Sequence, residues 1–411
     1  MPGLRCRQSR LRNGSDRLIN RGESISPPRE NALSPLIIIG SGLAGFSLAR
    51  EWRKLDSTTP LRIFTSDDGG FYSKPMLSNA IAGGKSAAQL AMKTAQQMAL
   101  ELNAEINSHT EISAIHPERH CITVNGQEVT YSRLVLAQGA DPIRPPMQGD
   151  SADDLLSVNN LDDYARFRAA LEGNKRVAIL GGGLIGCEFA NDLLAGGFSV
   201  DVIDPGTHPL AALLPVEASL KLQDALGQQG VNWHFGVKAE AVERAGDALR
   251  LTLSDDSSLD ADVVLSAIGL RSRTALAAAA GITVKRGIVV DDQLKTSAPD
   301  VFAIGDCAEA QGKVLLYIMP LMQQARTLAK VLAGTEAELI YPVMPVVIKT
   351  PACPITVCPP ALGAEGEWKV ESTPLGVRAL FFDSTEQLLG FALTEQATAE
   401  KTTLAQQLVQ S

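Results

Sequence analysis

The 411-residue sequence has no apolar run long enough to cross a membrane. A membrane-spanning helix needs about 18–20 consecutive apolar residues, so we predict no membrane span. Positive charge is also scarce: 37 Lys and Arg face 46 Asp and Glu, and the net charge is −9. This balance argues against nucleic acid as a general partner.

Cysteine is sparse and scattered. There is no C-x-x-C pair and no cluster with metal-ligand spacing among Cys6, Cys121, Cys187, Cys307, Cys353 and Cys358. We therefore predict no metal site and no disulfide framework, a pattern typical of a protein in the reducing cytoplasm. Cys353 and Cys358 form the one candidate redox pair. In an extended segment an offset of five residues puts the two side chains on opposite faces, which disfavours it.

The chain is too long for a single hydrophobic core, so two or three domains are expected. Residues 1–34 hold seven arginines, three acidic residues and no apolar run. We predict that this segment is a disordered basic extension, with an organelle-targeting peptide as the alternative.

A short buried strand followed by three spaced glycines opens the rest of the chain. Leu36–Ile39 is apolar, and Gly40, Gly42 and Gly45 follow at G-x-G-x-x-G spacing before a helical pattern. Gly40 permits a tight turn, Gly42 lets a pyrophosphate approach the backbone, and Gly45 lets the helix pack on the strand. The unpaired N–H groups at the start of the helix would bind the phosphates.

The same pattern returns in residues 176–204, RVAILGGGLIGCEFANDLLAGGFSVDVID. Gly181, Gly183 and Gly186 repeat the spacing, and Asp204 closes the second strand. A carboxylate at that position binds the 2′-hydroxyl of NADH and repels the 2′-phosphate of NADPH, so NADH is the expected nucleotide. Two such units in one chain are far more specific than either glycine run alone.

The first unit departs from the pattern where a ribose would be held. Thr65 ends its second strand at the place where Asp or Glu is usual, and Asp67 and Asp68 lie slightly beyond. We expect the adenosine ribose of the first nucleotide to be held differently, through Thr65 and Ser66.

Further buried strands and helices follow along the chain. Apolar strands are predicted at 133–139, 261–269 and 301–306, and helices at 161–172 and 319–332. From about residue 341 the chain is rich in proline and strand-like, and it ends in a helical pattern over 395–409. The predicted fold class is therefore α/β, with two Rossmann-like dinucleotide-binding domains and a small α+β C-terminal domain.

The order of these motifs carries a family resemblance. The two fingerprints, LVLAQG, SAIGL (266–270) and AIGDCAE (303–309) follow one another as in the glutathione-reductase-like flavoprotein reductases, which the chain resembles over residues 35–340. The segments YSKPMLS, LIGCEFANDL, YIMPLM and KTPACP resemble more closely the members of that family that reduce rubredoxin in alkane-oxidising bacteria.

The resemblance implies a division of labour along the chain. FAD would bind a discontinuous domain of residues 35–147 and 275–340, NADH would bind residues 148–274, and residues 341–411 would form a cap domain. The implied activity is electron transfer from NADH through FAD to rubredoxin, supplying an alkane hydroxylase or a similar chain in the cytoplasm.

One absence separates the chain from relatives that reduce disulfides or peroxides. Those relatives carry a redox cysteine shortly after the first unit, whereas Ser73–Met76 contains none. Electrons would then leave the flavin directly for a one-electron carrier. The alternatives left open are a 2Fe–2S ferredoxin as acceptor, an NADH oxidase or peroxidase, and a flavin-binding interaction protein that is not primarily an enzyme.

The resemblance also implies roles for single residues. Lys74, paired with Glu188 in a partly buried site, would act beside the flavin as the catalytic pair. Asp306 would accept hydrogen bonds from the ribityl chain, Lys349 would contact the flavin, and the helix near Met319 would direct its positive end at the ring. The expected FAD set is Gly40, Ser41, Gly42, Leu43, Ala44, Gly45, Thr65, Ser66, Lys74, Ile112, Gly139, Glu188, Asp306, Met319 and Lys349. The expected NAD set is Gly181, Gly183, Leu184, Ile185, Gly186, Asp204 and Gly269.

Transient electrostatic docking is expected of an acidic rubredoxin. The candidate cations are Arg50, Arg53 and Lys54 on the first fingerprint helix. Oppositely charged surfaces raise association rates, and added salt weakens the effect.

Overall fold

The computed structural model describes residues 34–408. The basic extension predicted for residues 1–34 thus lies outside the described residues, except for Ser34. Within residues 34–408 no helix is both long and apolar enough to span a bilayer. Over the same range, no group of three or more His, Cys, Asp or Glu side chains gathers in a way that could hold a metal ion.

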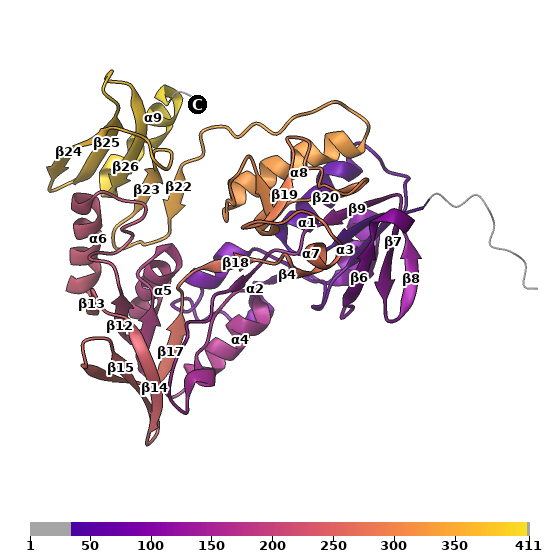
Figure 1. Ribbon diagram of the computed structural model, residues 1–411. Coiled ribbons are helices and arrows are strands. Elements are labelled where there is room, and N and C mark those ends of the chain that lie inside the picture. Colours follow the sequence, from indigo (N-terminus) through magenta and orange to yellow (C-terminus); the bar gives the residue numbers. More distant parts are fainter. Residues whose placement is uncertain (1–33, 409–411) are drawn as a thin grey trace, which may run out of the picture. The chain divides into compact units, whose positions relative to one another are not determined.

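The first glycine fingerprint belongs to a five-stranded parallel sheet (Figure 1). Helices α1 (Leu43–Arg53) and α8 (Ile318–Leu332) pack against each other beside it. The strands, in spatial order, are β20 (Val301–Ala303), β9 (Arg133–Leu136), β1 (Leu36–Ile39), β2 (Leu61–Phe64) and β5 (Glu105–Asn107). Strand β20 joins the edge of this sheet from far along the chain, which brings the AIGD segment to the first fingerprint.

The second fingerprint belongs to a four-stranded parallel sheet. Its strands are β13 (Val231–Phe235), β12 (Ser199–Asp204), β11 (Arg176–Leu180) and β17 (Val263–Ser266), and its helices are α4 (Leu161–Ala170), α5 (Leu184–Ala195) and α6 (Val216–Gln228). An antiparallel sheet of β14 (Ala239–Ala245), β15 (Ala248–Leu253) and β16 (Ser258–Ala261) accompanies it.

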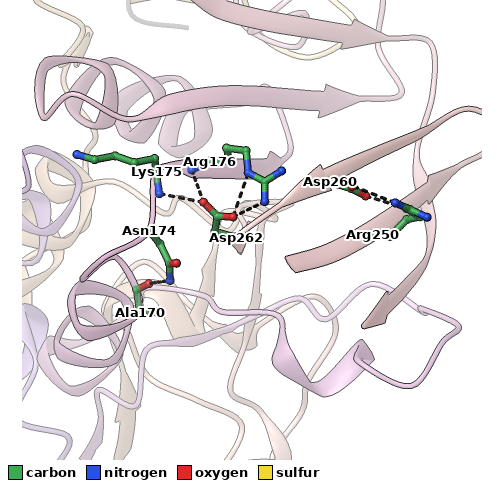
Figure 2. A network of polar contacts seen from close by, with 7 residues as sticks. All are labelled: Ala170, Asn174, Lys175, Arg176, Arg250, Asp260 and Asp262. Atoms are coloured by element: carbon green, nitrogen blue, oxygen red, sulfur yellow. Dashed lines mark hydrogen bonds and ion pairs between the residues drawn. The ribbon is translucent and has the colours of Figure 1, made fainter. Parts of the chain in front are cut away.

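The carboxylate of Asp262, directly before β17, binds the start of the neighbouring strand β11 (Figure 2). The side chain of Asp262 accepts the backbone N–H groups of Lys175 and Arg176, each at 2.9 Å, and pairs with the Arg176 guanidinium. These bonds lower the pKa of Asp262 to about 2. The contact lies at the amino ends of the strands, opposite the carboxyl ends where the glycine turns lie.

The C-terminal segment forms a five-stranded antiparallel sheet. In spatial order its strands are β22 (Val346–Ile348), β23 (Ile355–Cys358), β26 (Leu388–Thr394), β25 (Gly376–Phe382) and β24 (Glu367–Thr373). One face shares a hydrophobic core with α5 and α6 of the second unit, including Ile355, Val377, Phe189 and Leu222. The helix predicted over 395–409 is shorter in the structure, because residues 395–400 form a 3₁₀ turn before α9 (Lys401–Gln407).

Residues 71–102, which follow β2, form several short elements and not one long helix. Two short helices there each begin at a capping box, at Ser86 and Thr94, and a strand separates them.

Further elements of the fold are β3 (Phe71–Tyr72), a 3₁₀ helix Lys74–Asn79, α2 (Ala87–Leu90), β4 (Ala91–Lys93), α3 (Ala95–Leu102), β6 (Ile112–His116), β7 (Cys121–Val124), β8 (Gln127–Thr130), β10 (Ala140–Pro142), β18 (Leu270–Ser272), α7 (Ala275–Ala279), β19 (Ile288–Val290) and β21 (Ala308–Ala310).

Candidate functional site

The first glycine turn is shaped by close backbone contacts. A Cβ atom at Gly40 would lie 2.2 Å from the carbonyl oxygen of Ala137, and one at Gly45 would lie 2.1 Å from the carbonyl oxygen of Gly40. No atom lies within 4 Å of a Cβ placed on Gly42. The turn thus needs glycine for packing at its first and third positions, and its middle position opens to a ligand.

A carboxylate that the sequence pattern did not select stands at the ribose end of this turn. The Ser41 hydroxyl lies 2.9 Å from both Thr65 Oγ1 and Asp67 Oδ1, and Thr65 donates to Asp67 Oδ1 at 2.6 Å. Asp67 also accepts the N–H of Gly69. Asp67, two residues after Thr65, thus lies beside the first glycine turn, at a place that spacing alone does not reveal.

The second glycine turn repeats this construction. A Cβ at Gly186 would lie 1.9 Å from the carbonyl oxygen of Gly181, whereas Gly183 is open. The two carboxylate oxygens of Asp204 accept the N–H groups of Gly182 and Gly206, each at 2.6 Å. These two hydrogen bonds orient Asp204 toward the turn.

One cavity of about 2130 Å³ joins both turns. Apart from Gly45 and Gly186, which pack beneath the turns, all the residues expected to bind FAD or NAD line it. Three residues from elements beyond the two sheets are among them, namely Ile112, Met319 and Lys349. The structure thus brings these residues together from separate stretches of the chain that run from Gly40 to Lys349.

The expected pairing of Lys74 with Glu188 is wrong in the structure. Lys74 Nζ lies 3.7 Å from Asp306 Oδ2, and Glu188 pairs instead with Lys349, whose Nζ lies 2.8 Å from Glu188 Oε2. Sequence comparison by motif cannot choose between two lysines that lie 275 positions apart, because the choice depends on how the C-terminal segment folds back.

Glu188 lies at the centre of a buried network and is 1% exposed. Its Oε2 accepts the Ser78 hydroxyl at 2.6 Å, and its Oε1 accepts the backbone N–H of Lys349 at 2.9 Å. The Lys349 ammonium also donates to Ser78 Oγ at 2.8 Å and to the carbonyl oxygen of Pro75. The buried carboxylate thus has one cation and two hydrogen-bond donors, with contacts at both of its oxygens.

Lys74 and Asp306 face each other across the cavity lining. Burial lowers the pKa of Lys74, and the charge of Asp306 opposes that shift. Asp306 follows strand β20, and Lys74 begins the 3₁₀ helix Lys74–Asn79. The cation and the anion thus come from two segments that lie far apart in the sequence. The pair gives the cavity a positive group beside a negative one.

The cysteines do not supply a redox pair. Cys121, Cys187, Cys307, Cys353 and Cys358 are all free thiols, and Cys6 lies outside the described residues. Cys358 lines the cavity, but burial raises its pKa to about 11, so it stays protonated and unreactive near neutral pH.

The cations proposed for docking on α1 are already engaged. Arg50 pairs with Glu101 and Lys54 pairs with Glu51. Arg53 donates its guanidinium to four backbone carbonyl oxygens, which belong to Asp56, Thr59, Leu102 and Asn103. Arg53 therefore serves the fold, and this helix offers little unpaired positive charge.

The cavity fits two dinucleotides. It contains two open glycine turns at the starts of α1 and α5, whose unpaired N–H groups suit pyrophosphates, and each turn has its own carboxylate at the ribose end. Tyr317, Met319 and Pro320, at the start of α8, add an apolar wall for a planar ring.

Comparison with known proteins agrees with this geometry. Residues 34–329 match the family described as pyridine nucleotide-disulphide oxidoreductase. Residues 338–408 match a second family, described as a rubredoxin binding C-terminal domain.

Curated relatives match along nearly the whole chain. The chain is 50% identical over 377 residues to a rubredoxin-NAD(+) reductase of Alcanivorax borkumensis, covering 92% of this chain and 99% of that protein. It is 45% identical to a rubredoxin-NAD(+) reductase of Acinetobacter baylyi, covering 90% and 96%. Among solved structures, a ferredoxin reductase from Rhodopseudomonas palustris matches with a TM-score of 0.82 and 25% identity, covering 90% of this chain and 93% of that one.

Proposed function

The chain belongs to the pyridine nucleotide-disulphide oxidoreductase family, and within it we propose that it delivers electrons from NADH to rubredoxin for an alkane hydroxylase or a similar chain in the cytoplasm. It is an NADH-dependent oxidoreductase whose cofactors are FAD and NAD(H) and whose protein partner is rubredoxin. The observation that carries the proposal is that two glycine turns open into one cavity in a chain whose residues 338–408 match a rubredoxin binding C-terminal domain.

The domain bounds are part of the proposal. FAD is assigned to residues 35–147 and 275–340, since strand β20 and helix α8 complete the sheet and wall of the first unit. NAD(H) is assigned to residues 148–274, and the cap to residues 341–411. The residues proposed to hold each nucleotide are those given in the sequence analysis, with Asp67 added at the ribose of FAD.

The charged side chains that line the cavity have physical tasks in this reaction. Bound FAD supplies the chemistry of accepting a hydride from NADH and releasing electrons one at a time. Lys74 places a cation in a partly buried site, and Asp306 accepts hydrogen bonds from polar groups of the cofactor. The positive end of α8 stabilises negative charge near its first turn. Glu188 and Lys349 hold the Ser78 segment in place.

Rubredoxin is proposed to dock on the C-terminal segment rather than on α1. Ile340 and Val347 border the cavity there and are 63% and 54% exposed. Residues 338–408 carry four cations, Lys349, Lys369, Arg378 and Lys401, against eight acidic residues, Glu338, Glu365, Glu367, Glu371, Asp383, Glu386, Glu395 and Glu400. Apolar contact therefore suits an acidic partner at this surface better than charge attraction does.

The test of this function is a comparison of acceptors. With NADH as donor, the purified FAD-loaded protein is expected to reduce rubredoxin with a kcat/KM at least about tenfold above that for a 2Fe–2S ferredoxin, a difference of roughly 1.4 kcal/mol. Oxygen and hydrogen peroxide serve as the oxidase and peroxidase controls. A preference for ferredoxin, or turnover with oxygen that rubredoxin does not exceed, would contradict the proposal.

The nucleotide preference is tested at Asp204. Replacing Asp204 with Ala removes the carboxylate proposed to accept the ribose 2′-hydroxyl of NADH, and one charge-assisted hydrogen bond is worth about 1.5–3 kcal/mol, so kcat/KM for NADH is expected to fall about 10- to 100-fold. The control is Asp201→Ala in the same strand, whose carboxylate bonds His234 instead of the turn. Steady-state kinetics with NADH and with NADPH give the two kcat/KM values. A wild-type enzyme with the higher kcat/KM for NADPH would refute the assignment of NADH as the donor.

A further inference from the structure

Helix α5 carries three buried polar side chains on one face, and each binds backbone from another part of the chain. Glu188, Asn191 and Asp192 are 1%, 6% and 6% exposed. Glu188 and Asn191 accept the N–H groups of Lys349 and Ala352 in the C-terminal segment, at 2.9 and 3.0 Å. A polar face of this kind is unusual on a buried helix and indicates that α5 sets the position of its neighbours.

Asp192 binds a different segment from the other two. Its Oδ2 accepts the N–H of Ile81 at 2.7 Å, and its Oδ1 accepts the N–H of Ala82 at 3.3 Å. These amides lie directly after the 3₁₀ helix that begins at Lys74. The carboxylate therefore holds the far end of the segment that places Lys74 in the cavity.

Apolar packing supports the same contact. Leu77 and Ile81 are each 3% exposed and belong to one hydrophobic cluster with Phe189 and Leu193 of α5. The hydrophobic effect that drives this packing is not directional, whereas two hydrogen bonds to one carboxylate add a directional constraint on the register.

The second glycine turn lies at the start of α5. Gly183 precedes the helix and Leu184 begins it, and both line the cavity. Asp192 lies nine residues after Gly183, roughly 13 Å along the axis at 1.5 Å per residue. A single rigid helix thus carries the nucleotide-binding turn at its start and the anchor of the Lys74 segment further along.

We propose that Asp192 is a positioning residue, which fixes the Lys74 segment in register with the nucleotide-binding turn and so sets the rate of hydride transfer without touching either nucleotide. The kinetic part of this inference rests on the proposed function, and the structural part does not.

Asp192→Asn is the informative variant because it keeps the shape of the side chain. The amide can accept one backbone N–H, but its NH₂ group then faces the other N–H and cannot accept it. Burial raises the pKa of Asp192, and the hydrogen bonds from the two backbone amides oppose this shift.

The control uses the same chemistry at the other end of the second sheet. Asp262 also binds two successive backbone N–H groups, those of Lys175 and Arg176 (Figure 2). Both of these N–H groups bind Oδ2 and the Arg176 guanidinium binds Oδ1, so Asp262→Asn removes the charge of their shared acceptor and breaks the ion pair at the amino ends of the strands, where neither glycine turn lies.

The first measurement is amide hydrogen exchange in the FAD-loaded protein. Exchange at Ile81 and Ala82 is expected to quicken at least about tenfold in Asp192→Asn, the change expected when one charge-assisted bond is lost. In Asp262→Asn it should quicken only at Lys175 and Arg176. Unchanged exchange at Ile81 and Ala82 would overturn the inference, and this result does not depend on which acceptor the enzyme uses.

The second measurement is the rate at which NADH bleaches the flavin absorbance in anaerobic stopped flow. Asp192→Asn is expected to be about tenfold slower with the same apparent affinity for NADH, while Asp262→Asn matches the wild type. Faster exchange with an unchanged bleaching rate would overturn the positioning role. Failure of the proposed function would be seen separately, as wild-type protein that bleaches with NADH but does not reduce rubredoxin.

Discussion

Replacing Gly45 with alanine is expected to weaken FAD binding about 10- to 100-fold. The new Cβ would lie 2.1 Å from the carbonyl oxygen of Gly40, which is backbone and cannot rotate away. Helix α1 must therefore move off strand β1, and forced overpacking of this kind costs about 1–3 kcal/mol. The start of α1 is the phosphate-binding end, so the shift acts directly on the cofactor.

Titration of flavin-free protein with FAD measures this effect. The matched control is Gly227→Ala in helix α6, where the nearest atom to the new Cβ is Trp233 Nε1 at 3.9 Å. That change is expected to leave FAD binding intact and to stabilise the helix by up to about 1 kcal/mol. Equal FAD dissociation constants for Gly45→Ala and wild type would show that the first turn does not hold the cofactor.

Replacing Lys349 with methionine is expected to destabilise the protein by about 2–3 kcal/mol. The change leaves the carboxylate of Glu188 buried without its cation, and breaking a buried pair costs about 3–5 kcal/mol. The expected loss is smaller because Lys349 is partly exposed and Ser78 still donates to Glu188. Unfolding by urea, monitored on the FAD-loaded protein, gives the change in the midpoint.

Two further variants distinguish the cost of leaving the buried Glu188 carboxylate without a cation from the cost of removing any lysine. Lys369→Met removes an exposed partner of Glu386 in the same C-terminal sheet and is expected to cost less than about 1 kcal/mol. Adding Glu188→Gln to Lys349→Met should recover at least half of the loss, since the carboxylate no longer needs a cation. A Lys349→Met protein as stable as Lys369→Met would mean that the pair does not join the C-terminal segment to α5.

The parts of the site that the sequence predicted are those fixed by local rules. Each glycine turn lies within one strand–turn–helix unit, so spacing alone predicted the turns at Gly40 and Gly181 and the helices α1 and α5 that follow them. The acidic end of β12 at Asp204 follows from the same unit. The family resemblance supplied the assignment of each unit to its nucleotide.

The parts that the sequence did not predict depend on contacts between distant segments. Lys349 reaches Glu188 across 161 positions, so no periodicity points to the pair. Asp67 reaches Ser41 and Thr65 at the first glycine turn through a bend of the backbone, and Asp192 resembles an ordinary surface aspartate until Ile81 is placed against it. In each case the missing information was the three-dimensional position of a partner.

We expect electrons to pass from NADH to rubredoxin through the flavin alone, without a thiol relay. An anaerobic titration of the FAD-loaded protein with NADH distinguishes the two routes, because each redox centre takes its own pair of electrons. Without a relay, one equivalent of NADH per flavin bleaches the flavin completely and no new free thiols appear. Consumption of two equivalents, with the release of a dithiol, would show that a thiol relay takes part.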